Sequence, residues 1–564
     1  MRTCRCPDPA VGVVSSLVCR SRSVIRPSWD GRCAGARVHA PSHRPEWADS
    51  AGDAPAAAPQ FPSVALIPLL ALFAGAMLAP GLLVGPSLDA AVFSDVGGRL
   101  LHGVVPYLGA WDHKPPGIYL VDAGAQATLG WLGPWTAEWL LSLAVAVGIG
   151  MAVSSALVGL GVTGWPRSLA AIGATIFASH YLLALGGGLT EPPATLLVAW
   201  ALVLAIRPAS GTRIAAIGLL VGLSALISVQ LLPGGLTVLA VALVQRPAER
   251  RLRVGSLLAI GFAAPLVAVG IWLLAIGAIP AALNAVLTYA VAYRSAGSEY
   301  GATLATSVGA WTTLLSLFLV APALLGAASV ATLPPPRRTA VLALLLWVVV
   351  TLLFFVFQGR FYAHYGIALA APLGILAGLG LRRVGESLRR TSRTGSRVVI
   401  VLPLLATLLA SVVAGVVSAA LQLALVADEN VRLQAVSQTL RDLPAGRLLV
   451  WGNEPRLYTL ANRAPATRYS YLYPLTTPNY STREQINEVV RALADHPPAI
   501  VVDVGSAAPG QPGFLPLLID RPVATDGRDL DLLDPLRGFV AAHYQLVSTV
   551  SGWPIYVLRR LDVP

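Results

Sequence analysis

Between two long apolar runs (61–84 and 138–160) lies the stretch LDAAVFSDVGGRLLHGVVPYLGAWDHKPPGIYL (88–120), which is dense in acidic residues, histidines and prolines. Lys114 within it is the only lysine of the chain, although the sequence holds 40 lysine and arginine residues. A lone lysine is either a chance remnant in an arginine-rich chain or a position that needs a compact ammonium on a flexible stem. The stretch is therefore the first candidate for a functional site.

The composition is that of a membrane protein. Of the 564 residues 55% are hydrophobic and 12% are charged, whereas soluble proteins carry about 25% charged residues. Several uncharged runs reach the ~20 residues that are needed to cross a bilayer. The net charge of +12 does not indicate nucleic-acid binding, because the arginines concentrate in short loops and in the N-terminal tail. We expect an α-helical polytopic membrane protein.

Eleven apolar segments are candidate spans: 61–84, 138–160, 167–186, 191–206, 213–231, 233–246, 254–279, 309–332, 339–357, 364–381 and 398–426. Segment 117–133 is also apolar, but it is short, rich in glycine and carries Asp122 and Gln126. Whether it crosses the membrane or lies on its surface changes the orientation of every later span.

The basic loops decide between these two topologies. If 117–133 lies on the surface, the arginine-rich loops all fall on one face: Arg167, Arg207/Arg213, Arg246–Arg253, Arg337/Arg338 and Arg382–Arg397. The loops of the other face between 85 and 364 then hold only Arg99, Lys114, Arg294 and Arg360. Because basic loops face the cytoplasm, we expect eleven spans in the plasma membrane, a cytoplasmic N-terminus and an extracytoplasmic C-terminus. Segment 117–133 becomes an interfacial helix on the outer face.

The chain divides into three parts. Residues 1–60 are rich in Arg, Pro, Ala and Ser without periodicity, contain all four cysteines, and are expected to form a disordered cytoplasmic tail. Residues 61–426 form the membrane region. Residues 427–564 have the composition of a soluble domain, which we expect on the outer face.

Polar residues of the membrane region gather at one depth. With this topology, the first outer loop, the outer ends of the spans and the later outer loops hold nearly all the ionisable groups, while the span interiors are almost free of them. An ion-coupled transporter would place charges near the midplane. The pattern favours a site at the outer boundary of the membrane. Outer loops are, however, also polar simply because they are exposed to water.

Two motifs and a third, weaker one resemble a known family. The stretch 88–120, with its Gly-Arg helix, Pro-Tyr and Trp-Asp-His-Lys-Pro-Pro elements, is similar to the first outer loop of bacterial GT-C glycosyltransferases of the protein-mannosyltransferase/aminoarabinose-transferase superfamily. QGRFYAHYGIALAAPLGILAGLGL (358–381) resembles the family's entry into a late span, and GGLTEPPATLL (187–197) is a weaker match. The resemblance covers about residues 61–426.

The resemblance implies an enzyme that transfers a hexose or pentose, with inversion, from a polyprenyl-phosphate carrier to a glycan, lipid or protein acceptor of the cell envelope. By position, Asp89 matches the first acid of the family's acidic pair, and the second is Ala90 here. The resemblance allows a divalent cation, but Ala90 argues against a two-carboxylate metal site, so we assign no metal and no cofactor. Ser228 is a second departure, since relatives carry a basic residue near this position.

The chemistry assigns roles to the residues of these motifs. Such a transfer needs a base for the proton of the acceptor and cations for the departing phosphate. We expect Asp89 to be the base, unless it is only a helix N-cap. Lys114 and Arg360 are the expected phosphate partners, although Arg360 is also suited to an interfacial anchor. The expected substrate-binding residues are Asp95, Asp112, His113, Glu191, Tyr362 and His364.

The C-terminal region is expected to be a small α/β domain. GRLLVWG (446–452), PPAIVVDVG (497–505) and PIYVLRRL (554–561) are typical of strands, and TREQINEVVRALADH (482–496) is typical of an amphipathic helix capped by Thr482. The C-terminal region lacks a Gly-rich phosphate-binding motif. We expect it to recognise the acceptor or to cover the site.

Two other functions remain open at this point. A transporter or flippase of lipid-linked glycans would need a polar path through the spans, which the sequence does not show. An inactive scaffold of the same fold would have no need to keep Asp89 and Lys114.

Overall fold

The computed structural model describes residues 65–207, 210–295, 319–358, 361–390, 427–507, 516–518 and 530–559, and positions 402, 406, 413, 417, 420, 423 and 424. Every described residue lies in one compact second unit of the chain, Gln60–Pro564. The predicted tail, Arg360 and most of the predicted span 398–426 lie outside the described residues.

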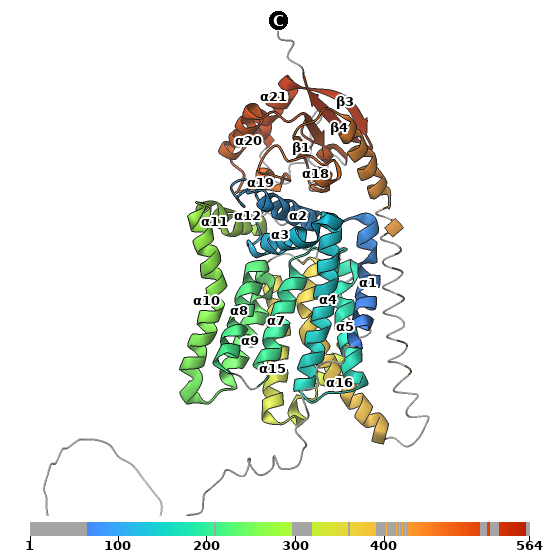
Figure 1. The fold of residues 1–564 in the computed structure, drawn as a ribbon, viewed down its shortest axis with the longest axis vertical. Helices are drawn as coiled ribbons and strands as arrows, with labels where there is room; N and C mark the ends of the chain where they lie inside the picture. The colour runs from blue at the N-terminus through green and yellow to red at the C-terminus, as the bar shows by residue number, and fades with distance from the viewer. Residues whose placement is uncertain are drawn as a thin grey trace, which may run out of the picture. The chain divides into compact units, whose positions relative to one another are not determined.

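A bundle of apolar helices forms the larger part of the second unit (Figure 1). Its helices are α1 (Leu66–Val84), α4 (Pro134–Gly159), α5 (Trp165–Ser179), α7 (Glu191–Ala205), α8 (Gly211–Ile227), α9 (Leu232–Val244), α10 (Arg251–Ala275), α14 (Val320–Ala327), α15 (Pro335–Gln358) and α16 (Ala370–Arg390). Small residues let some of them approach closely. A side chain at Gly218 of α8 would collide with the backbone of α10 at Leu258, and one at Gly261 of α10 would collide with Ala215.

Five described helices are long and apolar enough to cross a membrane: Leu66–Val84, Pro134–Gly159, Ala248–Ala275, Arg338–Gln358 and Ala363–Arg390. Three shorter apolar helices, Glu191–Ala205, Gly211–Ile227 and Val229–Val244, correspond to further predicted spans. The protein is therefore a polytopic membrane protein, and the number of eleven spans stays a prediction.

Two helices of the first loop lie at one end of the bundle, next to the C-terminal domain (Figure 1). They are α2 (Leu88–Leu101) and α3 (Gly117–Leu129), and we call this end of the bundle the α2–α3 end. With 13 residues, α3 is only about 20 Å long, too short for the ~30 Å hydrocarbon core. This length agrees with the prediction that 117–133 does not cross the membrane.

The polar residues that made 117–133 ambiguous are used within the protein. The amide of Gln126 donates to the Ser94 carbonyl of α2 at 2.9 Å. Asp122 is buried and lies beside Glu138 of α4, and these two groups interact electrostatically. Both residues therefore face protein and not lipid.

Short elements complete the α2–α3 end: η1 (Gly130–Leu132), α6 (Tyr181–Ala184), η2 (Val229–Leu231), α11 (Ile279–Leu283), the π-helical turn η4 (Asn284–Thr288), α12 (Tyr289–Ser295) and η6 (Ala363–Leu369). At the opposite end, η3 (Ala248–Arg250) and η5 (Val330–Thr332) lead into α10 and α15.

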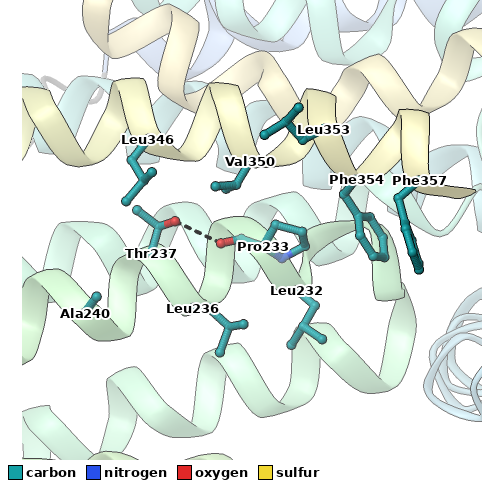
Figure 2. Close-up of a pocket in the computed structure, with 10 residues that line it drawn as sticks. All are labelled: Leu232, Pro233, Leu236, Thr237, Ala240, Leu346, Val350, Leu353, Phe354 and Phe357. Carbon is teal, nitrogen blue, oxygen red and sulfur yellow. Dashed lines mark hydrogen bonds between the residues drawn. The ribbon is translucent and has the colours of Figure 1, made fainter.

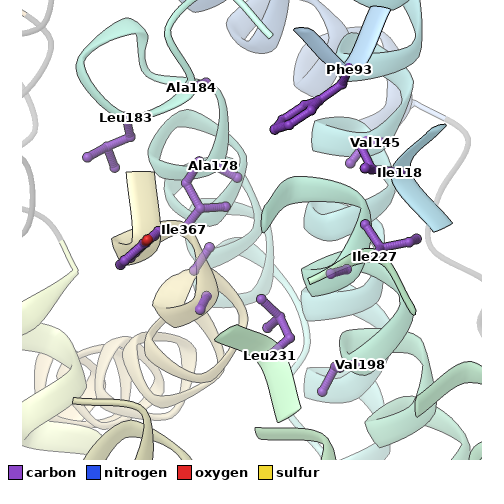
Figure 3. Close-up of a cluster of buried hydrophobic side chains, with 14 of the residues drawn as sticks. Phe93, Ile118, Val145, Ala178, Leu183, Ala184, Val198, Ile227, Leu231 and Ile367 are labelled. Atoms are coloured by element: carbon purple, nitrogen blue, oxygen red, sulfur yellow. The ribbon is translucent and has the colours of Figure 1, made fainter. Parts of the chain in front are cut away.

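One buried apolar cluster joins the elements of this end. Phe93 of α2, Ile118 of α3, Val145 of α4, Ile227 of α8 and Ile367 of η6 all belong to it (Figure 3). Their side chains are at most 6% exposed. The loops between these elements are therefore attached to a packed core rather than to independent helices.

The C-terminal region is an α/β domain, as predicted. Its sheet contains β1 (Leu448–Trp451), β2 (Ile500–Asp503), β3 (Tyr544–Val550) and β4 (Trp553–Leu558) in the order β1-β2-β4-β3. β1 and β2 are parallel, and β4 is antiparallel to both β2 and β3. The helices are 427–442, α18 (Arg456–Leu460), α19 (Tyr473–Thr476), α20 (Arg483–Asp495) and α21 (Asp534–His543), with 3₁₀ turns η7 (Val504–Ala507) and η8 (Leu530–Leu533).

The structure confirms three predicted strands and the predicted helix. Thr482 caps α20 in a capping box with Gln485, as its position before the amphipathic run indicated. Strand β3 was not predicted. Its signal was present in the Ser551–Gly552 pair, which takes positive φ at both residues (50° and 85°) and closes the β3–β4 hairpin.

Candidate functional site

Lys114 lies in the loop between α2 and α3, and its backbone is tightly held. The Tyr107 hydroxyl donates to the Lys114 carbonyl at 2.9 Å, and the Tyr119 hydroxyl shares its hydrogen between that carbonyl, at 3.1 Å, and Asp112. Tyr107 itself has a left-handed backbone (φ 68°), a conformation that a non-glycine residue adopts only when its surroundings impose it. The loop therefore presents Lys114 in a defined position.

The Lys114 ammonium is a charged group without a hydrogen-bond partner among the described residues. Burial alone would lower the pKa of Lys114. The pKa is nevertheless raised above its ordinary value, because Tyr365 and Glu191 lie close to the ammonium. Asp89 and Asp112 add smaller contributions of the same sign. The site thus favours the protonated form of Lys114, whose ammonium has no hydrogen-bond partner in the described part of the chain and can bind an anion.

Asp89 lies in the first turn of α2 and is exposed. The hypothesis that it caps this helix is wrong, because Ser87 is the N-cap and its hydroxyl accepts from the Ala90 amide at 3.2 Å. The Asp89 carboxylate makes no hydrogen bond within the described part of the chain. It is close enough to Lys114 and His364 to interact with both electrostatically. Asp89 is therefore an accessible carboxylate beside the ammonium.

Asp112 is buried and receives hydrogen bonds from two sides. The Tyr119 hydroxyl donates to Oδ2 and the Tyr471 hydroxyl donates to Oδ1, both at 2.7 Å. His113 Nδ1 lies 3.2 Å from Oδ1. Burial would raise the pKa of Asp112, but His113, Tyr471 and Tyr119 together lower it. This carboxylate stays ionised and fixes the loop on which Lys114 stands.

Glu191 begins a chain of buried polar groups that leads to Tyr365. Its Oε1 accepts from the Thr190 hydroxyl at 2.9 Å, and its Oε2 has no partner among the described residues. The Ser228 hydroxyl, 3.5 Å from that of Thr190, donates to Gln230 at 2.6 Å. Gln230 in turn hydrogen-bonds the Tyr365 side chain. Ser228, one of the two departures from the family pattern, is therefore part of a hydrogen-bonded chain that begins at Glu191.

The second motif supplies an aromatic wall. The rings of Tyr362 and His364 stack with centroids 5.5 Å apart, and the Tyr362 hydroxyl lies 2.8 Å from that of Tyr293. His113 joins this wall through ring contacts with Tyr289 and Tyr293 of α12. Arg360, the second expected phosphate partner, lies outside the described residues.

Asp95 is used differently from what the sequence suggested. Its Oδ2 accepts from the Ser470 hydroxyl at 2.6 Å and from Arg99 at 3.4 Å. Asp95 is not among the groups that shift the pKa of Lys114. The structure thus places Asp95 at the contact between α2 and the C-terminal domain.

Sequence reasoning missed several residues of this site. Tyr365 and Gln230 stand within or beside segments already singled out, so proximity to His364 and Ser228 was an available signal. No sequence signal pointed to Tyr289, Tyr293 and Tyr471, because they come from segments far from both motifs along the chain. In the residues that the structure describes, no three His, Cys, Asp or Glu side chains gather in a way that could hold a metal ion.

An apolar groove of about 560 Å³ lies between α9 and α15 (Figure 2). Its one polar lining side chain, Thr237, donates to the Pro233 carbonyl at 2.9 Å and so has no hydrogen left to donate to a ligand. Leu236 and Leu353 on its walls are 52% and 62% exposed, so the groove is open to the surroundings of the bundle.

The groove ends near the charged site. Its first lining residue, Leu232, follows Gln230 of the network by two positions. At the C-terminal end of α15, the Arg294 guanidinium lies 4.3 Å from the centroid of the Phe357 ring, another lining residue. A molecule with an apolar tail and an anionic head could thus occupy both the groove and the site.

Solved structures show what this fold is. ArnT from Cupriavidus metallidurans in the apo state matches with a TM-score of 0.53 at 14% identity, over 87% of this chain and 98% of that one. The same protein bound to undecaprenyl phosphate matches with a TM-score of 0.52 at 15% identity, over 89% and 99%. At these identities the likeness shows the fold, which is the GT-C fold that the sequence resemblance predicted. No family model and no curated protein sequence matches the chain.

Proposed function

We propose that this protein is a membrane glycosyltransferase that moves a sugar from a polyprenyl-phosphate carrier to an acceptor. The observation that carries the proposal is the free ammonium of Lys114, held beside the carboxylates of Asp89 and Glu191 near the end of an apolar groove. A solved structure of ArnT, which has the same fold, holds undecaprenyl phosphate. The groove suits such a chain, and the ammonium suits its phosphate.

The chemical step uses the two free charged groups. The acceptor hydroxyl gives its proton to Asp89 while its oxygen forms a bond to the anomeric carbon of the donor sugar. The bond from that carbon to the phosphate oxygen breaks, and its electron pair leaves with the phosphate. Lys114 stabilises the negative charge that develops there. Attack from the face opposite the phosphate inverts the anomeric carbon.

The remaining residues hold this geometry. Asp112 fixes the Lys114 loop, and His113, Tyr362 and His364 line the space beside it with aromatic faces on which a sugar ring can stack. Glu191, with one carboxylate oxygen free, is suited to a hydroxyl of either substrate. Arg360 is proposed as a second phosphate contact from its position in the motif alone.

We place the site on the outer face of the plasma membrane. The arginine-rich turns before α5, α8 and α10 and the end of α16 all lie at the end of the bundle opposite α2 and α3, by the connectivity of the helices. Basic residues mark the cytoplasmic side. The C-terminal domain then lies outside, where a cell-envelope acceptor is available.

The test combines binding with a deletion strain. We expect the purified protein to bind undecaprenyl phosphate in detergent, and Lys114→Ala to weaken that binding. Mass spectrometry of the deletion strain should show one sugar missing from an envelope glycan, lipid or protein and the sugar-loaded carrier accumulating. Glycans and lipids identical to those of wild type would contradict a transferase. Loss of one whole glycan from the envelope, with its completed lipid-linked precursor accumulating, would point to the transporter instead.

A further inference from the structure

A four-residue segment of the C-terminal domain lies along the first loop. The Trp111 amide donates to the Arg468 carbonyl at 2.8 Å, and Arg468 donates back to the Tyr107 carbonyl at 3.2 Å. Ser470 donates to Asp95 and Tyr471 donates to Asp112. We call Arg468–Tyr471 the clamp segment. Besides Asp95 of α2, its contacts run along the loop from Tyr107 to His113, whose Nδ1 lies 3.3 Å from the Tyr471 hydroxyl.

Aromatic packing reinforces this contact. The Trp111 ring is 2% exposed and packs against Tyr469 and Tyr471, with centroids 5.9 and 5.8 Å away. Ser470, between these two tyrosines, points to α2 instead. This alternation is that of an extended chain, in which successive side chains face opposite ways. The clamp segment is therefore fixed on both of its faces.

The Tyr471 hydroxyl is the part of the clamp segment that reaches the charged site. It supplies a hydrogen bond to Oδ1 of Asp112 at 2.7 Å, while Tyr119 supplies that to Oδ2. Oδ2 also lies 3.4 Å from the Lys114 amide, so the orientation of this carboxylate sets the position of the Lys114 backbone. Without the Tyr471 hydroxyl, His113 is the one partner of Oδ1 that remains among the described residues.

We propose that Tyr471 is a positioning residue for Lys114, acting through Asp112, so that the C-terminal domain completes the phosphate-binding site of the membrane region. The proposal rests on the function proposed above in naming a phosphate as the ligand. The mechanical part, that Tyr471 holds the Lys114 loop, stands on the contacts alone. The domain is then a part of the site and not only a cover over it.

Hydrogen exchange tests the mechanical part without any ligand. Tyr471→Phe keeps the ring against Trp111 and removes only the hydroxyl. In the full-length protein we expect amide exchange in residues 107–119 to become about three- to tenfold faster, as expected for the loss of one hydrogen bond that resists local opening. Tyr469→Phe is the matched control, because its hydroxyl accepts from Arg468 and does not contact Asp112. Equal exchange in Tyr471→Phe and wild type would overturn the proposal.

A double-mutant cycle tests whether Tyr471 acts through Asp112. Undecaprenyl phosphate is the probe, and its affinity is measured for wild type, Tyr471→Phe, Asp112→Asn and the double variant. We expect Tyr471→Phe to bind about three- to tenfold more weakly and the double variant to bind like Asp112→Asn alone. If the losses of affinity in the two single variants add in the double variant, Tyr471 does not act through Asp112. If wild type does not bind the probe, the proposal of a polyprenyl-phosphate donor is wrong. The exchange experiment still shows whether Tyr471 holds the Lys114 loop.

Discussion

The hydroxyl of Ser470 donates to Oδ2 of Asp95 at 2.6 Å, across 375 positions of the chain. Asp95 also pairs with Arg99 of the same helix, so the contact joins α2 to the C-terminal domain through a carboxylate that is almost fully buried. Asp89, six residues earlier on that helix, is exposed and free of hydrogen bonds to described residues. One helix therefore carries a carboxylate used for assembly and another available for chemistry.

Lys114→Ala is expected to raise KM for the lipid donor and to lower turnover, with expression unchanged. Losing one partly desolvated contact to a charged phosphate costs about 1.5–3 kcal/mol. Lys114→Arg should restore only part of the activity. The planar guanidinium of arginine must approach the phosphate from another direction, and the loop backbone cannot adjust because Tyr107 and Tyr119 fix it. Steady-state kinetics with the purified variants measure both effects. Full activity of Lys114→Arg would show that the lone lysine is a chance remnant.

Asp89→Asn is expected to fold normally and to lose about 10²–10⁴-fold in kcat, because the amide cannot accept the acceptor's proton. Ser87→Ala is the matched control, since it removes the cap of the same helix. It should cost about 1 kcal/mol of stability and leave kcat near wild type. Complementation of a deletion strain gives the first readout. Wild-type glycan levels with Asp89→Asn would remove Asp89 from the mechanism.

Asp112 predicts a dependence of stability on pH. Its pKa is lowered in the folded protein, against its own burial, by His113, Tyr471 and Tyr119. A group of this kind stabilises the fold fully above its unfolded pKa of about 3.9, and the contribution is lost as pH falls from there through the folded pKa. Thermal unfolding in detergent between pH 7 and pH 3 should therefore show less acid destabilisation in Asp112→Asn than in wild type. The same slope in both proteins would contradict an ionised Asp112.

Ala240→Trp is expected to obstruct the groove between α9 and α15, which Ala240 lines (Figure 2). Binding of undecaprenyl phosphate should weaken by about tenfold or more, because the added indole occupies space that the chain would need. Binding of a short-chain prenyl phosphate should change little. Ala259→Trp, at an exposed position of α10 outside the groove, is the control. Equal loss with both phosphates, or none with either, would mean that the lipid tail lies elsewhere.

Cysteine labelling tests the proposed orientation. In a background without the four native cysteines, Ser551→Cys in the β3–β4 turn should react with an impermeant reagent on intact cells. Arg250→Cys, at the opposite end of the bundle before α10, should react only after permeabilisation. Reaction of position 250 on intact cells would reverse the topology and with it the location of the site.

The local elements followed closely from the sequence. Apolar run length predicted the membrane helices, short apolar runs predicted β1, β2 and β4, and Thr482 before the amphipathic run predicted the start of α20. The helix cap at Ser87 was missed, because Ser and Asp are both good caps and lie two positions apart. Such choices depend on backbone angles that neighbouring segments impose.

What the sequence determined by itself was the membrane character, the two motifs, and the grouping of Lys114, Asp89 and Glu191 at one end of the bundle, because these depend on hydropathy, charge and short spacings. Only the tertiary structure decided that Asp95 serves assembly, that Gln230 and Tyr365 belong to the charged site, and that Tyr471 reaches Asp112. These contacts join segments up to several hundred residues apart. Their geometry is set by packing around a shared core, which leaves no periodic trace in the sequence.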